Sequence, residues 1–160
     1  MAQKTEKTNV MRLLEQHGVD YIARDYSGTG AVSGADVARV LGLDPDSVFK
    51  TLVTAASSGA HYVFMVPVER ELDLKKAARA VGEKSVSMIR QRDLLPLTGY
   101  IHGGCSPIGM KKPFPTVIDE TAELFDTIAF SAGKIGFQVE LGLAGLRRVI
   151  PVTSADICED

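Results

Sequence analysis

Hydrophobic residues recur along the chain at two spacings, which predict short helices mixed with short strands. Spacing of three and four residues predicts helices over Thr8–His17, from a Ser33 cap to Leu41, and from an Asp73 cap to Val81. Alternating or continuous apolar runs predict strands. These lie at Tyr21–Tyr26, Val48–Ala55, Tyr62–Val68, Val86–Met88, Thr116–Asp119, Thr127–Ser131 and Gly136–Leu141. A helical turn over Arg90–Leu95, a last helix over Ala144–Ile150 and a polar tail complete the pattern.

The strongest β signal is a predicted hairpin, Val48–Ala55 and Tyr62–Val68, around a Ser-Ser-Gly turn. Pro67 suggests that its second strand ends at a sheet edge. Strands and helices do not alternate strictly, and no linker or repeat interrupts the chain. The sequence therefore predicts one mixed α/β (α+β) domain over residues 1–160, with its core at about 8–150 and a strongly curved or closed sheet.

Composition narrows the class of protein. Of the 160 residues, 45% are hydrophobic and 24% are charged, which is ordinary for a globular domain and excludes a disordered, collagen-like or coiled-coil chain. A net charge of -2 argues against a wholly basic nucleic-acid binder, but permits a local basic pocket. The polar N-terminus is unlike a signal or transit peptide, and no apolar run is long enough to span a membrane. Two distant cysteines fit a reducing compartment, so we expect a soluble cytoplasmic protein.

The common catalytic motifs are absent. The chain has no GxSxG elbow and no phosphate-binding GxxxxGK[ST] loop. Its histidines, His17, His61 and His102, are scattered, and the cysteines do not cluster, so neither a metal site nor a cofactor is expected. His102 adjoins a glycine-rich segment and is the histidine best placed to contact a ligand.

Lys50 is an unusual residue for its predicted strand, VFKTLV, because both faces of that strand are otherwise apolar. Such a strand is normally buried on both faces, and an isolated buried ammonium is costly. Lys50 therefore either reaches solvent from an edge strand or lies in a pocket, where it binds a phosphate or a carbonyl oxygen.

Two loops of small residues strengthen the pocket interpretation. They are GGCSPIG, from Gly103 to Gly109, and SAGKIG, from Ser131 to Gly136. Glycine permits positive φ and close approach of the backbone, so successive N–H groups can point at one oxygen. Either loop alone is equally typical of a tight structural turn, but two such loops and a core lysine together favour a ligand site.

Three segments in this order resemble the YbaK/EbsC family of bacterial Cys-tRNA(Pro) deacylases. They are VFKTL around Lys50, YIHGGCSPIGMKK over Tyr100–Lys112, and FSAGKIGFQVEL over Phe130–Leu141. The family is related to the editing domain of bacterial prolyl-tRNA synthetases, and the resemblance covers residues 8–150. It implies a distorted β-barrel flanked by helices. It also implies hydrolysis of the ester that joins a wrong amino acid to the 3′ adenosine of a tRNA.

The resemblance also implies the site residues. Lys50 matches the lysine regarded as essential in the family. The matching substrate-binding residues are Tyr26, Gly103, Gly104, Ser106, Ser131 and Gly133. Two positions depart from the family pattern. Gln138 stands where relatives often carry Asp, so an acidic role is not carried over to it. Cys105 stands where an aliphatic residue is common in relatives, so it is not a family catalytic residue.

In the Cys-specific members of that family, the cysteinyl thiol of the substrate is held to attack its own ester. The enzyme then supplies orientation and oxyanion stabilisation. We therefore expect trans editing of mischarged Cys-tRNA(Pro), with the tRNA and a prolyl-tRNA synthetase–tRNA complex as partners, and with no membrane or DNA partner. The alternatives are deacylation of Ala-tRNA(Pro) or another mischarged tRNA, and a non-catalytic module that binds tRNA or the synthetase. The role of Lys50, at the oxyanion or at a phosphate, stays open.

Overall fold

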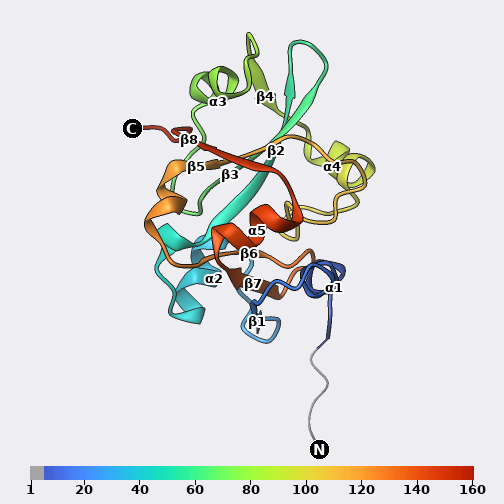
Figure 1. Cartoon of the computed structure of the whole chain (residues 1–160), viewed down its shortest axis with the longest axis vertical. Coiled ribbons are helices and arrows are strands. Elements are labelled where there is room, and N and C mark those ends of the chain that lie inside the picture. Colours follow the sequence, from blue (N-terminus) through green and yellow to red (C-terminus); the bar gives the residue numbers. More distant parts are fainter. Residues whose placement is uncertain (1–5) are drawn as a thin grey trace, which may run out of the picture.

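Helices and strands form close to their predicted positions within residues 6–160, the part of the chain that the computed structural model describes (Figure 1). The helices are α1 Asn9–Gln16, α2 Gly34–Leu41, η1 Pro45–Ser47, α3 Leu74–Val81, α4 Gln91–Thr98, η2 Glu120–Leu124 and α5 Leu143–Val149. The strands are β1 Ile22–Asp25, β2 Phe49–Ala56, β3 His61–Pro67, β4 Val86–Met88, β5 Thr116–Asp119, β6 Ile128–Ser131, β7 Phe137–Leu141 and β8 Val152–Ala155. Within this part of the chain, every helix is too short or too polar to cross a bilayer. Residues 1–5, which the sequence pattern assigns to the domain and to its polar N-terminus, lie outside the described residues.

Local capping explains why these helices begin and end where they do. The side chain of Ser33 accepts a hydrogen bond from Asp36 N, and that of Asp73 accepts from Lys75 N and Lys76 N. Gly42 and Gly82 close the same two helices in the left-handed conformation that glycine adopts without strain. These signals are contained in a few neighbouring residues, so the sequence predicts them well.

Sheet order follows from longer-range pairing. One sheet has the order β1-β7-β6 and the other has the order β4-β2-β3-β5-β8. β3 is internal, so the edge position expected from Pro67 is wrong. β5 pairs only with Val63–Met65, and Pro67 lies beyond that ladder, opposite Phe49 of β2. The neighbouring Val68 N–H donates to Val48 O at 2.9 Å, so the missing N–H of Pro67 costs no ladder bond.

The mixed α/β domain is confirmed, but its strands form two sheets and no closed barrel within residues 6–160. The sheets are joined through an isolated parallel bridge between Val48 and Ala129, where β2 runs past β6. Figure 1 shows the β1-β7-β6 sheet beside α1 and α2 at one end of the molecule, with β4 and α3 at the other end.

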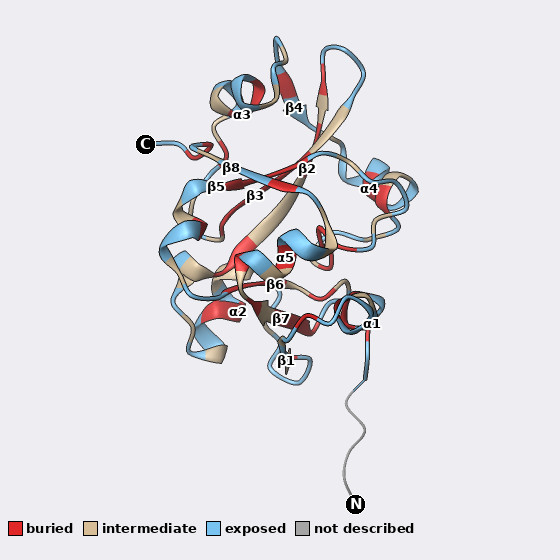
Figure 2. Cartoon of the chain, in the orientation of Figure 1, coloured by how far each residue is buried: buried red, intermediate tan, exposed pale blue. Residues whose placement is uncertain are grey.

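Apolar side chains cover both faces of the five-stranded sheet. Met65 of β3 belongs to the main core, which also contains Phe130 of β6 and Leu14 of α1. Phe64 and Val66 face the opposite side, where they pack with α3 and the C-terminal segment. Figure 2 shows buried positions along β3 and β5 in the middle of the molecule and along β7 in its lower part. Burial on two faces explains the continuous apolar run that β3 shows in the sequence.

The C-terminal segment is part of the core, contrary to the polar tail that we expected. β8 pairs in parallel with β5, and both Ile157 and Cys158 are fully buried. The core therefore continues past residue 150. The segment has a polar composition because its few buried residues, Val152, Ile157 and Cys158, are flanked by exposed polar ones. Asp119 holds the segment by accepting a hydrogen bond from Ile157 N at 3.1 Å.

We expect Asp119→Asn to lower the free energy of unfolding at pH 7 by about 1–3 kcal/mol. Burial alone would raise the pKa of the Asp119 carboxyl, but hydrogen bonds from Thr121 and Ile157 outweigh burial and lower it. A lowered pKa in the folded state means that the stabilisation is complete above the unfolded pKa. It is lost as the pH falls through the folded value. Urea unfolding at pH 7 and at about pH 3 should show the difference between wild type and variant shrinking in acid. An equal difference at both pH values would contradict this prediction.

Candidate functional site

A cavity of about 580 Å³ opens where the start of β2, the end of β6 and the N-terminus of α2 converge. Its lining residues are Tyr26, residues 32–35, Val37, residues 48–52, Val68, Leu94, His102, Gly103, Cys105, Phe130, Ser131 and Gln138. The wall thus combines segments from most of the chain. Its apolar part is large enough to shelter a small ligand from water.

Lys50 lies on this wall, although it is neither fully exposed nor fully buried. Its side chain retains 28% exposure, and its Nζ lies 3.5 Å from Glu71 Oε1. β4 pairs with β2 only at Thr54–Ala56, so the Lys50 end of β2 is left free to border the cavity. Lys50 thus borders the cavity, as the pocket interpretation expects, and its ammonium reaches an exposed ion pair, as the edge-strand interpretation expects.

Three further predicted residues join Lys50 in the cavity wall. Tyr26 follows β1, is 4% exposed and is held by its backbone N–H, which donates to Gly136 O at 2.7 Å. Ser131 ends β6, where its Oγ accepts a hydrogen bond from Gly133 N at 3.1 Å. Gly103 adopts a φ of +88°, a conformation that a side chain would strain.

The other three predicted residues, Gly104, Ser106 and Gly133, do not line this cavity. A Cβ on Gly104 would lie 3.1 Å from Ile135 N, so this glycine lets the two loops pack against each other. Ser106 is fully buried, and its Oγ accepts a hydrogen bond from Ile108 N. A Cβ on Gly133 would approach Tyr100 Cε1 to 3.0 Å. In this structure, these residues build the loops that carry the wall.

Two polar residues of the wall were missed by the site prediction. Thr51 Oγ1 and Gln138 Oε1 are buried and have no hydrogen-bond partner within residues 6–160. Gln138 is 2% exposed and lies opposite Ser131 in the β6–β7 ladder. The alternation of FQVEL places Gln138 on the face away from Phe137 and Val139, which was the available signal. Buried acceptors without donors are uncommon in proteins and often mark a functional site.

Cys105 also lines the cavity, but its thiol is not activated. The side chain is 9% exposed, and burial raises the pKa of the thiol to about 12. The thiolate is the reactive form, so this cysteine is a poor nucleophile at neutral pH. Within the described residues, neither Cys105 nor Ser131 is hydrogen-bonded to a histidine or a carboxylate. No carboxylate lines the cavity, and no cluster of metal-ligating side chains occurs in residues 6–160.

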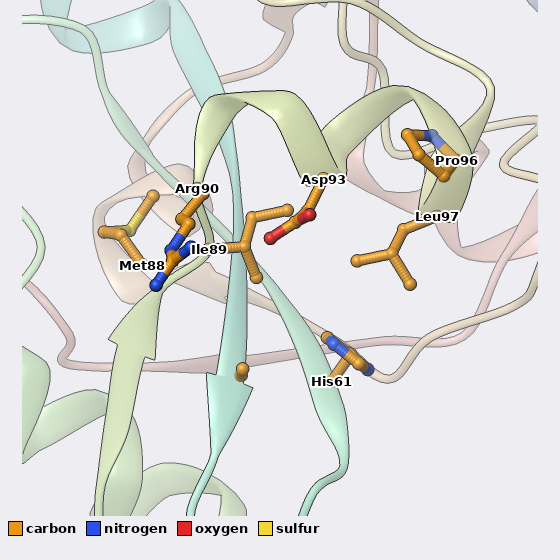
Figure 3. Close-up of a pocket in the computed structure, with 8 residues that line it drawn as sticks. His61, Met88, Ile89, Arg90, Asp93, Pro96 and Leu97 are labelled. Atoms are coloured by element: carbon orange, nitrogen blue, oxygen red, sulfur yellow. The ribbon is translucent and has the colours of Figure 1, made fainter.

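A second, shallower cavity of about 380 Å³ lies at the other end of β2 (Figure 3). His61, Arg90 and Asp93 border it, with Ile89 and Leu97 between them. It contains none of the residues that the sequence singled out for a site. The larger cavity is therefore the candidate functional site.

Comparison with known proteins shows the family of the chain, and the matched residues border both cavities. The family model described as "Aminoacyl-tRNA editing domain" matches residues 30–149, which is most of the chain. The chain belongs to this family. Lys50, Gly103, Ser131 and Gln138 all lie within the matched part of the editing domain, whereas Tyr26 precedes it.

Relatives of this editing domain include both free-standing proteins and parts of synthetases. The chain is 47% identical, over 144 residues and 88% of each chain, to "Putative Cys-tRNA(Pro)/Cys-tRNA(Cys) deacylase EbsC" of Enterococcus faecalis. It is 32% identical over 85 residues to the proline–tRNA ligase of Pelobacter propionicus, covering 53% of this chain and 15% of the ligase. The crystal structure of a "putative trans-editing enzyme for prolyl tRNA synthetase" has the same fold, with a TM-score of 0.81, 23% identity and coverage of 97% and 100% of the two chains.

We expect both thiols of the native editing domain to resist a disulfide reagent such as Ellman's reagent at pH 8. Burial is the main cause that raises the pKa of Cys105 and of Cys158 to about 12. Unfolding in urea should release two reactive thiols, or one in a Cys105→Ser control, as measured by absorbance. Rapid labelling of Cys105 in the folded protein would show instead that the cavity holds an activated thiol.

Proposed function

We propose that this chain is a trans-editing enzyme that cleaves the ester of mischarged Cys-tRNA(Pro). The observation that carries the proposal is the position of Lys50. It is a cation in the wall of a cavity that Gly103 and Ser131 also line, in a chain that belongs to the editing-domain family. The 47% identity with the Enterococcus faecalis deacylase supports the choice of cysteine as the amino acid that is removed.

In the proposed reaction, the substrate supplies the nucleophile. The sulfur of the cysteinyl group forms a bond with its own ester carbonyl carbon, and the bond between that carbon and the 3′ oxygen breaks. The thiol proton passes to the 3′ oxygen, so the products are a cyclic thioester and free tRNA. This scheme agrees with a cavity in which Cys105 is protonated and Ser131 has no base within the described residues.

The protein contributes orientation and charge stabilisation. Holding the reacting atoms in an attack geometry is worth up to about 7–11 kcal/mol. We assign stabilisation of the oxyanion to the Lys50 ammonium and to backbone N–H groups of the Gly103–Gly104 turn, a role for which one donor typically supplies about 10²–10³ in rate. Tyr26 and Ser131 position the 3′ end of the tRNA. Gln138 and Thr51 offer acceptors to hydroxyl or ammonium groups of the substrate.

We further propose that the tRNA is delivered in a complex with prolyl-tRNA synthetase, in the cytoplasm where tRNA is charged. A net charge of -2 gives little attraction for a polyanion, so a partner that already holds the tRNA would compensate for weak binding. The similarity to part of a proline–tRNA ligase agrees with this arrangement.

Lys50→Ala should retain the fold and lose at least about 100-fold in the rate of Cys-tRNA(Pro) deacylation. The ammonium lies in the cavity wall, and its removal takes away the charge that faces the developing oxyanion. The rate is measured from the loss of labelled Cys-tRNA(Pro), with circular dichroism as a check on folding. Full activity of the variant would remove Lys50 from the mechanism.

A panel of Cys-, Ala- and Ser-charged tRNA identifies the preferred amino acid.

Ser-tRNA(Pro) should be cleaved far more slowly than Cys-tRNA(Pro), because a hydroxyl is a much weaker nucleophile than a thiol with a pKa near 8.5. The two substrates are nearly equal in size, so the difference reports on chemistry and not on fit. Mass spectrometry of the products should detect the cyclic thioester before water opens it. Equal rates for the two substrates would indicate attack by water. Loss of turnover in Cys105→Ser would indicate a nucleophile of the protein.

A further inference from the structure

The Lys50 ammonium has a carboxylate beside it that the proposed reaction does not use. Glu71 Oε1 lies 3.5 Å from Lys50 Nζ, and Glu71 is the ion-pair partner that the structure gives Lys50 within residues 6–160. The two side chains differ in environment, since 28% of Lys50 and 72% of Glu71 is exposed. Glu71 does not line the cavity. The ion pair therefore draws the ammonium toward the solvent side of the cavity wall.

The backbone at Glu71 is held in place by the C-terminal segment. Glu71 O accepts a hydrogen bond from Glu159 N at 2.9 Å, and Asp73 N donates to Ile157 O at 2.8 Å. Between them, Leu72 forms an antiparallel bridge with Cys158. These contacts fix the position from which the Glu71 carboxylate reaches Lys50.

The same segment is anchored by charged side chains. The Arg70 guanidinium donates to Glu159 O, and Lys76 Nζ contacts the side chains of Asp156 and Asp160 as well as Cys158 O. The turn that carries Glu71 is thus tied to the chain end from both sides.

We propose that Glu71 is the resting counter-ion of Lys50 and that the substrate displaces it. This inference rests on the proposed function, in which Lys50 binds an oxygen of the aminoacyl ester inside the cavity. Glu71 neutralises the ammonium when the cavity is empty. An incoming ester must break the ion pair before Lys50 can turn to the carbonyl oxygen. Glu71 is therefore a positioning residue that weakens substrate binding.

The expected effect is small and has an unusual direction. Exposed ion pairs stabilise proteins little, so removal of the Glu71 charge should lower KM for Cys-tRNA(Pro) by about two- to five-fold. The ion pair is already broken in both the bound complex and the transition state, so kcat should not change. If Glu71 had only a structural role, its substitution would instead raise KM or lower kcat.

The test compares Glu71→Gln with Glu69→Gln. Both substitutions remove one negative charge from the same exposed turn, but Glu69 makes no ion pair in the described part of the chain. Initial rates of Cys-tRNA(Pro) deacylation should show the lower KM in Glu71→Gln alone. If Glu69→Gln lowers KM equally, general repulsion of tRNA is the cause. If kcat falls in Glu71→Gln, Glu71 orients Lys50 during catalysis. Either result, like an unchanged KM, would overturn the proposal.

A second measurement reports on the ion pair without activity. Proton–nitrogen correlation spectra of the lysine ammonium groups identify Lys50 by the signal that Lys50→Ala lacks. That signal should shift in Glu71→Gln and stay in place in Glu69→Gln. A signal that is insensitive to Glu71→Gln overturns this inference alone. If the wild type does not deacylate Cys-tRNA(Pro), the proposed function is wrong. Displacement of Glu71 by this substrate is then wrong too, even if the Lys50 signal shifts in Glu71→Gln.

Discussion

A lysine in a strand that is otherwise apolar imposes the main constraint on this structure. An ammonium that loses water needs an opposite charge or several hydrogen-bond acceptors. At Lys50 the strand neighbours supply neither, since Phe49 and Val48 are buried in apolar clusters. The cost is met by partial exposure and by the carboxylate of Glu71. Because the only ion-pair partner of Lys50 within the described residues is an exposed carboxylate, a ligand that binds the ammonium more strongly can replace it.

The rest of the fold holds the backbone of Lys50 in place, and Glu71 pairs with its ammonium. β2 is paired with β3 from Phe49 to Ala55, so the backbone of Lys50 is fixed near the start of a ladder. The facing loops are fixed in another way, because Gly104 permits close packing against Ile135. Walls built from paired strands and closely packed loops agree with a site whose contribution is orientation, since small displacements of reacting groups are costly.

Local signals predicted the elements well, but they could not predict how distant segments pair. The hairpin and the capped helices depend on residues that are close in sequence. The parallel pairs β3–β5 and β5–β8 join segments that are far apart, and this is why the internal position of β3 and the strand in the C-terminal segment were missed. A distorted barrel was expected from the family resemblance, but within residues 6–160 the strands form two sheets that are joined by an isolated bridge between Val48 and Ala129.

Site residues could be predicted where the residue type is unusual for its local segment of sequence. A lysine in a mostly apolar strand and a pair of adjacent glycines stand out in the sequence, and Lys50 and Gly103 do line the cavity. A glycine-rich motif does not reveal which member faces the ligand, so Gly104 and Gly133 were assigned to the wall although they pack the loops. Glu71 could not be found in sequence, because its turn reaches Lys50 only through the β2–β3 ladder and its contact with the chain end.

A cavity wall with one cation and no carboxylate among the described residues suits a substrate that carries its own nucleophile. A carboxylate near the ester would repel both a thiolate and the oxyanion, and none lines this cavity. The Lys50 ammonium has the opposite effect, because a nearby cation lowers the pKa of a thiol and also stabilises the negative charge that moves onto the carbonyl oxygen. One cation can thus assist both the deprotonation of the attacking sulfur and the build-up of negative charge on the carbonyl oxygen. In the proposed reaction this explains why the protein needs neither a base nor a nucleophile of its own, and why its cysteine in the wall can remain protonated.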